Sequence, residues 1–286
     1  MKYALIIPAI ICFFTARGQA IQPKLKFEQG KTINIHLQLK TTIVQQAMGQ
    51  AIDFTVEANA DHSYQVTNTT EDNSTLRHSV DHIGFSFDGM GQKRKFDSRD
   101  EKDLNGNFGK PVKDILDKKY DMVIDNNGNT LMAIPEKIVV GNDDPRMAII
   151  TSMLRDVFDL VQPPKTGTGS FFKVLPDSGT VKNKPWTESY ALPNGIFNAA
   201  YTISEITDST IVIDFAANSV TVTKAEMMGG ETTTNMNNKS TGKIIVDRAT
   251  GIMREKTMKT DSNGTTETAF GSLPVTSTTE ISMTVK

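Results

Sequence analysis

The chain has 286 residues with 31 basic and 33 acidic side chains, and aromatic residues make up 7% of it. This length allows one large β domain or two closely packed ones. The charge balance lacks the basic footprint of a protein that binds nucleic acid or an anionic membrane surface. Cys12 is the single cysteine, so the chain after it has no disulfide, thiolate metal site or cysteine nucleophile.

The first twenty residues have the pattern of a secretory signal peptide. Lys2 supplies the positive start, an apolar run follows over residues 5–14, and Gly18 and Ala20 place small residues before a cut at Ile21. A membrane-spanning helix needs about 20 apolar residues, and this run is half as long. The protein is therefore predicted to be exported, to the periplasm or the outer envelope surface, with no transmembrane segment after signal removal.

Removal of this segment changes the charge and the cysteine content. Loss of Lys2 and Arg17 leaves 29 basic residues against 33 acidic ones, a net charge of −4. Cys12 is not interpreted as a lipoprotein anchor, because Ile11 stands where that signal needs a small residue. The mature protein is expected to be stabilised by its hydrophobic core alone.

Alternating apolar and polar residues predict antiparallel strands before residue 142. The pattern runs from Ile33 to Lys40 and returns from Ile52 to Ala58. Polar clusters at Asn59–Asp61 and Glu71–Asn73 predict turns, so these strands are expected to form a meander.

The next strand reverses its pattern half-way. Leu76 and His78 share one parity, whereas Ile83 and Phe85 share the other. A strand changes its buried parity only by gaining a residue, so a β-bulge or bend is predicted near His82.

Residues 88–110 are polar and rich in glycine, and Phe96 is the apolar anchor of a predicted short edge strand. Pro111–Lys119 has the spacing of a short helix. Asp125–Asn129 has the composition of a hairpin turn.

Residues 143–162 carry the one long helical period. Asp143 or Asp144 precedes Pro145 as a capping oxygen, and Pro163 follows the predicted end. Apolar side chains recur here with helical spacing: Ile150, Met153, Leu154, Val157, Phe158 and Val161. Because such a stripe must be buried against the strands, a central crossover helix is predicted.

A second meander is predicted after the helix. A short strand is expected at 171–174, and alternating residues resume from Trp186 onward. Asp247–Gly251 and Asp261–Gly264 predict turns in which the glycine takes a positive φ. After residue 220 the strands are rich in Thr, Ser and Asn, which predicts a water-facing or edge part of the sheet.

Two sets of side chains have a spacing that suggests a metal site. His78 and His82 are four residues apart, which on a strand is about 13 Å, whereas zinc–nitrogen bonds are about 2 Å. Core or edge histidines are therefore favoured. Oxygen ligands from Asp125 to Glu136 fit a calcium loop in part, but Thr130 stands at its glycine position. The hairpin turn explains these residues better, and no metal or cofactor is predicted.

Enzyme motifs are lacking in the sequence. No carboxylate pair is singled out by its surroundings, as a glycosidase would need, and no glycine motif of nucleotide-binding or hydrolase sites occurs. No catalytic residue is assigned, and a non-catalytic protein is predicted. Trp186, the single tryptophan, is interpreted as a packing residue or as a platform for a sugar or lipid.

Three features carry a resemblance to a known family: Tyr120–Asp125 followed by Gly128, the central apolar stripe, and Leu175-Pro176 followed by Pro185-Trp186. With a leader that ends in Gly-Gln-Ala, they resemble a family of exported β-rich proteins of unknown function from Bacteroidota. Lys184-Pro185 departs from the Gly-Asp-type lead expected before Trp186. The resemblance implies an envelope location, an antiparallel β fold and no activity. At fold level the layout is also similar to half-barrels that carry lipids or lipoprotein acyl chains across the periplasm.

The predicted fold is α+β, mainly antiparallel β, with a curved β-meander sheet or half-barrel and one central amphipathic helix. One compact domain is expected, with meanders at 21–142 and 163–286 around the helix at 143–162. Two functions remain open: a non-catalytic envelope protein with a structural or protein-binding role, or a carrier of a hydrophobic lipid or acyl ligand held between helix and sheet. The ligand-binding residues expected of a carrier are Ile150, Met153, Leu154, Val157, Phe158 and Trp186. A carrier should also keep a cavity of a few hundred Å³.

Overall fold

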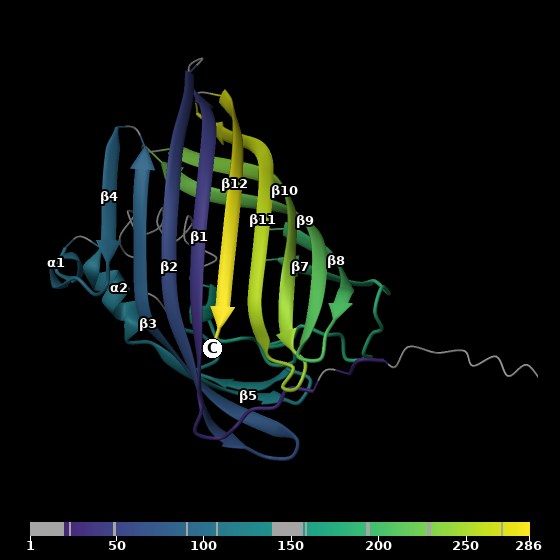
Figure 1. The fold of residues 1–286 in the computed structure, drawn as a ribbon. Coiled ribbons are helices and arrows are strands. Elements are labelled where there is room, and N and C mark those ends of the chain that lie inside the picture. The colour runs from purple at the N-terminus through teal and green to yellow at the C-terminus, as the bar shows by residue number, and fades with distance from the viewer. Residues whose placement is uncertain are drawn as a thin grey trace, which may run out of the picture.

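The structure is a computed structural model that describes residues 20–22, 24–47, 50–89, 91–106, 108–138, 157, 159–192, 195–227, 230–269 and 271–286. Within these residues, twelve strands form one antiparallel sheet that curves around the core (Figure 1). The strand order is β6-β5-β3-β2-β1-β12-β11-β10-β9-β8-β7, and β4 pairs with β3.

The central strands are long, and the shorter ones lie toward the two ends of the sheet. The strands are β1 (Thr32–Ala47), β2 (Gln50–Thr69), β3 (Asn73–Gly89), β4 (Gln92–Asp97), β5 (Lys119–Asp125), β6 (Thr130–Ile134), β7 (Trp186–Leu192), β8 (Gly195–Ile206), β9 (Thr210–Met227), β10 (Gly230–Asp247), β11 (Met253–Thr268) and β12 (Gly271–Val285). The described helices are α1 (Glu101–Leu104), α2 (Gly109–Leu116) and the 3₁₀ helix η1 (Asp159–Val161). No helix of the described chain is both long and apolar enough to cross a bilayer.

The predicted α+β class is wrong, because the described chain is nearly all antiparallel β and shows no central amphipathic helix. The sheet needs no crossover helix, since β1 pairs directly with β12 and the two halves of the chain meet through backbone hydrogen bonds. Most of the predicted helix at 143–162 lies outside the described residues. Of its stripe, the structure describes Val157, which is buried, and Val161 in η1, which is also buried.

The predicted β-bulge near His82 is confirmed. Asp61 pairs with His82 and the next residue, His62, pairs with Val80, so Asp81 is the extra residue of β3. This addition lets Val80 and Ile83 both face the core, although they lie three residues apart. The short edge strand around Phe96 is confirmed as β4, and the short helix predicted at 111–119 is confirmed as α2.

Two of the predicted turns are wrong, because both sequences continue as strand. Asn59–Asp61 lies inside β2, where the fully buried Ala60 fits between Leu37 and Ile83. Asp261–Gly264 lies inside β11, where a Cβ on Gly264 would be 1.8 Å from the carbonyl oxygen of Asn235. Glycine therefore serves close backbone approach here, rather than a turn.

The predicted turns at Asp125–Asn129 and Asp247–Gly251 are confirmed, and their glycines Gly128 and Gly251 have φ values of 85° and 72°. The strand predicted at 171–174 is wrong. Phe172 instead projects into the core, where its ring meets those of Phe27 at 5.2 Å and Tyr64 at 5.1 Å, edge to face in both cases.

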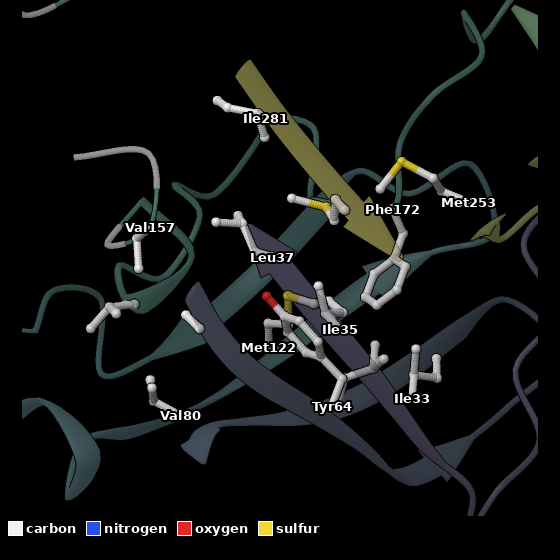
Figure 2. Close-up of a cluster of buried hydrophobic side chains, with 14 of the residues drawn as sticks. Ile33, Ile35, Leu37, Tyr64, Val80, Met122, Val157, Phe172, Met253 and Ile281 are labelled. Carbon is white, nitrogen blue, oxygen red and sulfur yellow. The ribbon is translucent and has the colours of Figure 1, made fainter. Parts of the chain in front are cut away.

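The packed core lies at one end of the long strands. Ile33, Ile35 and Leu37 project from β1 toward Met122 of β5 and toward Phe172 (Figure 2). The chain from η1 to about residue 180 and strand β5 thus form a second layer over this end of the sheet, and all five of these side chains are nearly or fully buried. We call this packed end the basal half of the sheet.

Candidate ligand-binding surface

Residues that pair across neighbouring strands share one face of the sheet, so the inner face, which turns toward the core, can be followed as rows. The last row of the basal half starts at Leu39 and crosses the sheet to Trp186. Its members are Leu39, Ile281, Met258, Gly242, Phe215, Tyr201 and Trp186. The rows beyond it, from Thr41 onward on β1, form what we call the open half.

One row of the open half illustrates which kinds of side chain line this surface. From β2 to β7 it contains Phe54, Ile43, Ser277, Ser262, Asn238, Ser219, Phe197 and Tyr190. The first seven side chains are half-buried and Tyr190 is exposed, in contrast to the buried Ile35 on the basal part of β1. The row is apolar at one end, hydroxylated in the middle and aromatic at the other end.

The hydroxylated stretch, which we call the hydroxyl wall, lies on the inner faces of β9 to β12. Its side chains bond to one another across strands, with oxygen–oxygen distances of 2.8 Å for Ser240–Thr260 and 3.0 Å for Thr234–Thr266. Asn238 donates to the hydroxyl of Ser219 at 3.0 Å. A hydroxyl has one donor and two lone pairs, so such pairing stabilises the sheet and leaves acceptor capacity toward the open side.

The opposite end of the open half, which we call the apolar wall, lies on β1 to β3. It consists of Ile43, Ile52, Phe54 and Phe87, all half-buried. The rings of Phe54 and Phe87 are 6.0 Å apart. Apolar surface that stays in contact with water raises the free energy of the protein. A ligand or partner that covers these side chains lowers that free energy.

Charged residues are sparse on the inner face of the open half and common on the outer face of the same strands. The row from Phe54 to Tyr190 and the row beyond it, from Ile52 to Gly195, contain no charged residue among the described side chains. The outer face carries ion pairs such as Lys40–Glu57 at 3.1 Å and Lys259–Asp261 at 3.5 Å. These two rows therefore form a partly solvated surface without charge, whereas the Thr41 row, which borders the basal half, has Arg94 at its β4 end and Glu188 at its β7 end.

Aromatic rings form a ladder on β7 to β9. Trp186 stacks on Tyr201 at 5.3 Å, Tyr201 meets Phe215 at 5.8 Å, and Tyr190 stacks on Phe197 at 4.8 Å. Burial raises the pKa of the Tyr201 phenol, and so do the nearby charge and hydrogen bond of Glu188. Trp186, predicted as a packing or platform residue, is part of this ladder and half-buried at the border of the two halves.

The other predicted ligand-binding residues are not brought to this surface by the described structure. Val157 lies in the packed core with no exposed surface, so it cannot meet a ligand there. Ile150, Met153, Leu154 and Phe158 lie outside the described residues. The hydroxyl wall was missed as a surface, because its Thr-rich strands were interpreted as a water-facing or edge part. The strands β10, β11 and β12 are in fact interior strands of the sheet.

Histidines and tyrosines form a buried cluster in the basal half. His62 Nδ1 is 3.1 Å from His78 Nε2, and the hydroxyls of Tyr64 and Tyr120 are 2.9 Å apart. The Tyr120 hydroxyl is also 3.2 Å from the carbonyl oxygen of Leu160, to which it can donate. Burial lowers the pKa of His62 to about 4 and that of His78 to about 3, and it raises the pKa of both tyrosines. These groups are thus held neutral within the core.

A second polar network lies around the bulge, between Asp61 and β4. Asp61 accepts from His36 at 2.6 Å and from Arg99 at 2.7 Å, and His82 Nε2 is 2.9 Å from Asp97. Burial acts to raise the pKa of Asp61, but the hydrogen bond from His36 and the charges of His36, His82 and Arg99 lower it overall. His78 and His82 thus have separate partners, as the strand spacing predicted.

No group of three or more possible metal ligands occurs within the described chain. In the loop considered for calcium, the Asp125 carboxylate instead accepts from the backbone N–H groups of Asn127 and Asn129, each at 2.8 Å. These bonds and the amide of Asn129 lower the pKa of Asp125 against the opposing effect of burial. The carboxylate holds the hairpin turn together.

Residues 71–253, more than half of the chain, match the family described as a family of unknown function (DUF6263). The chain belongs to this family. The resemblance to a family of unknown function is confirmed at that level, and the Bacteroidota origin stays a prediction. No curated protein matches the sequence of this DUF6263 member.

Among solved structures, this DUF6263 member is similar to one described as lipid–protein interactions in lipovitellin, with 10% identity and a TM-score of 0.46. The match covers 91% of this chain but spans only 26% of the lipovitellin chain. An outer membrane channel from Pseudomonas putida F1 matches with 8% identity and a TM-score of 0.24, covering 92% of this chain and 98% of the channel. Both TM-scores are low, so what this protein binds is inferred from its own side chains.

Proposed function

We propose that this protein is a non-catalytic, exported carrier of an uncharged amphipathic ligand, such as a lipid with an acyl chain and a hydroxylated head. The observation that carries the proposal is the inner face of the open half, which is half-buried and uncharged along the row from Phe54 to Tyr190. An ionic group placed on this row would find no partner charge within the row, because the charged residues Arg94 and Glu188 stand at the two ends of the neighbouring row. A ligand that is apolar at one end and hydroxylated at the other matches both walls.

The two walls indicate where the two ends of such a ligand would bind. Acyl carbons against Ile43, Phe54 and Phe87 would remove apolar surface from water, at about 25 cal/mol for each Å². Hydroxyl groups of the head would bond to acceptors of the hydroxyl wall, where Ser240 and Thr260 already bond to each other. The ligand-binding face thus differs from the predicted one, since it rests on strands rather than on a helix stripe.

The non-catalytic part of the proposal is supported by where the perturbed titratable groups lie. Catalytic acids and bases with shifted pKa values belong in a cleft that reaches substrate. Here His62, His78, Tyr64 and Tyr120 have large shifts and lie in the packed core, each at most 2% exposed. Their bonds to one another support a structural role. Tyr201, whose pKa is also raised, stacks on Trp186 in the aromatic ladder.

Export is supported by the backbone hydrogen bonds of the residue that follows the predicted cleavage site. Among the described residues, Ile21 is the first that is held at the base of the fold, through backbone hydrogen bonds of 2.7 and 3.0 Å with Thr180. A cut between Ala20 and Ile21 would leave these bonds in place. N-terminal sequencing of the protein from an expressing periplasm is expected to begin at Ile21, and a retained Met1 would contradict export by this signal.

Native mass spectrometry of residues 21–286, purified gently from a periplasm and followed by solvent extraction, tests the carrier. We expect a stoichiometric adduct with an extractable acyl-chain compound. Phe54→Asp should abolish this adduct, because it places a charge in the apolar wall. Val222→Asp is the matched control, since Val222 is exposed on the outer face of β9. An apo mass for the wild type, or equal loss in both variants with folded circular dichroism spectra, would contradict the carrier.

A protein-binding role is the second candidate, and the end strand β6 favours it. Leu131, Met132 and Ile134 are 48%, 46% and 57% exposed, and an end strand offers backbone groups to an added strand of a partner. In-cell crosslinking from position 132 is expected to capture a discrete partner whose yield falls in Ile134→Lys. A crosslink pattern unchanged by that substitution would contradict this role.

A further inference from the structure

Residues 21–22 and 24–26 run beneath the basal half and are held by three separate turns. Leu25 donates its backbone N–H to Asn126 at 2.8 Å, and Lys26 donates to Thr250 at 2.8 Å. The turns approach closely because each carries a glycine with positive φ. A Cβ on Gly179 would be 2.7 Å from the carbonyl oxygen of Ile21, and one on Gly251 would be 2.8 Å from that of Lys24.

This segment and the turns line a half-open cavity of about 400 Å³. The volume lies within the range of about 300–1,000 Å³ that small-molecule sites occupy. Its apolar lining comes from the segment, from the core loop and from β8 and β9: Ile21, Leu25, Phe172, Leu175, Ile206 and Ile211. The cavity lies at the opposite end of the long strands from the open half.

The charged residues of this lining are all basic. Lys24, Lys26 and Arg248 line the cavity, and no carboxylate does so among the described residues. The whole chain has a net charge of −2. The three cations that line the cavity therefore give it a charge opposite in sign to that of the whole molecule. The Arg248 guanidinium is oriented by a hydrogen bond from Nη1 to the carbonyl oxygen of Thr207 at 2.9 Å. A guanidinium carries five donors in a fixed fork that suits a carboxylate.

We propose that this basal cavity binds a small anionic amphiphile, an alkyl carboxylate of fatty-acid type, as a second site independent of the open half. The alkyl chain lies against the half-buried Ile21, Val174 and Ile206, and the carboxylate lies at Arg248 with the two lysines beside it. The two sites thus differ in ligand charge, since the row from Phe54 to Tyr190 has no charged residue and the basal cavity is lined by three cations.

The probe is sodium decanoate, with 1-decanol as the neutral ligand of equal chain length. Titration of the protein (residues 21–286) is followed by isoleucine methyl NMR and by calorimetry. Decanoate is expected to shift the methyl signals of Ile21, Ile206 and Ile211. It should bind at least about tenfold more tightly than decanol, because hydrogen bonds between charged groups are stronger than those to a neutral hydroxyl. Equal affinities, or no shift with decanoate, would overturn the proposal.

Variants of the cavity lining distinguish the contribution of its positive charge from that of its volume. Arg248→Gln should weaken decanoate by about tenfold and leave decanol unchanged, and Lys239→Gln on β10 is the control that removes a distant positive charge. Ala249→Trp should block both ligands, because Ala249 lines the cavity and is exposed at its rim. Retained affinity in Arg248→Gln, or an equal loss in Lys239→Gln, would overturn the site. Phe54→Asp is expected to leave decanoate binding intact, so failure of the open-half proposal is distinguishable.

Discussion

The basal and open halves of the inner face are built from the same strands with the same alternation, yet they end in different environments. On β1, Ile35 is 1% exposed, whereas Ile43 is half-buried. The difference lies in the second layer, since β5, η1 and the loop with Phe172 cover the basal half. Alternation sets which face a side chain takes, and the layer opposite decides whether that face becomes core or surface.

The largest expected effect comes from the same truncation at two heights of β1. Ile35→Ala should lower the free energy of unfolding by about 2–5 kcal/mol, because it leaves a cavity in a packed core. Ile43→Ala is the matched control and should cost clearly less, since water already reaches its side chain. Urea denaturation of both variants measures the difference, and equal losses would refute the division into halves.

Acid should destabilise the protein through the basal half. Burial keeps His62 and His78 neutral in the folded state, with pKa values of about 4 and 3 instead of 6.5. As pH falls through 6.5 the unfolded chain binds these protons first. Stability is therefore expected to fall from pH 6.5 toward pH 4, by roughly 1–3 kcal/mol. Urea midpoints measured across that window report the loss.

The control for this pH dependence is the other histidine environment. His62→Gln combined with His78→Gln should flatten the profile between pH 6.5 and 4, whatever its absolute stability. His36 is an exposed histidine that bonds to Asp61. In His36→Gln, the loss of stability that the buried pair causes between pH 6.5 and 4 should remain. A double variant with the wild-type slope would show that other groups control acid stability.

A smaller effect is expected from the tyrosine pair of the basal half. Tyr64→Phe removes one hydroxyl of a buried pair 2.9 Å apart and should cost about 1–2 kcal/mol. Ser63→Ala removes one member of the Ser63–Ser79 pair, also 2.9 Å apart, on the outer face. It should cost less, because water can replace the lost bond. Thermal and urea unfolding compare the two, and the reverse order would contradict the assignment.

The smallest effect is expected in the hydroxyl wall. Ser240→Ala combined with Thr260→Val should show a coupling of about 0.2–1 kcal/mol in a double-mutant cycle. The same double variant should reduce the yield of the ligand adduct more than it reduces stability. If adduct yield follows stability alone, the hydroxyls serve the sheet and do not contact the ligand.

The sequence was informative wherever local rules decide the outcome. The shift in parity between His78 and Ile83 predicted the bulge, because a strand has no other way to turn both segments inward. Gly128 and Gly251 marked true turns, since both adopt positive φ. The turn predicted at Gly264 was wrong, because glycine also occurs inside strands where two backbones lie close together, and the sequence does not distinguish the two cases.

The candidate sites were beyond prediction from sequence, because their parts come from distant positions. The row from Phe54 to Tyr190 joins eight strands, and the basal cavity joins Lys24 to Arg248. No local pattern records which strands become neighbours, and the pairing of β1 with β12 is set by the whole sheet. The amphipathic stripe at 143–162 predicted burial but could not specify a partner.

The strand alternation, the bulge and the glycine turns follow from local sequence, since they depend on steric rules within a few residues. The formation of one continuous sheet and the difference between its two halves follow from contacts between distant parts of the chain. The physical reason is that burial depends on the layer opposite a face, and the loop with Phe172 that forms this layer lies more than a hundred residues from β1.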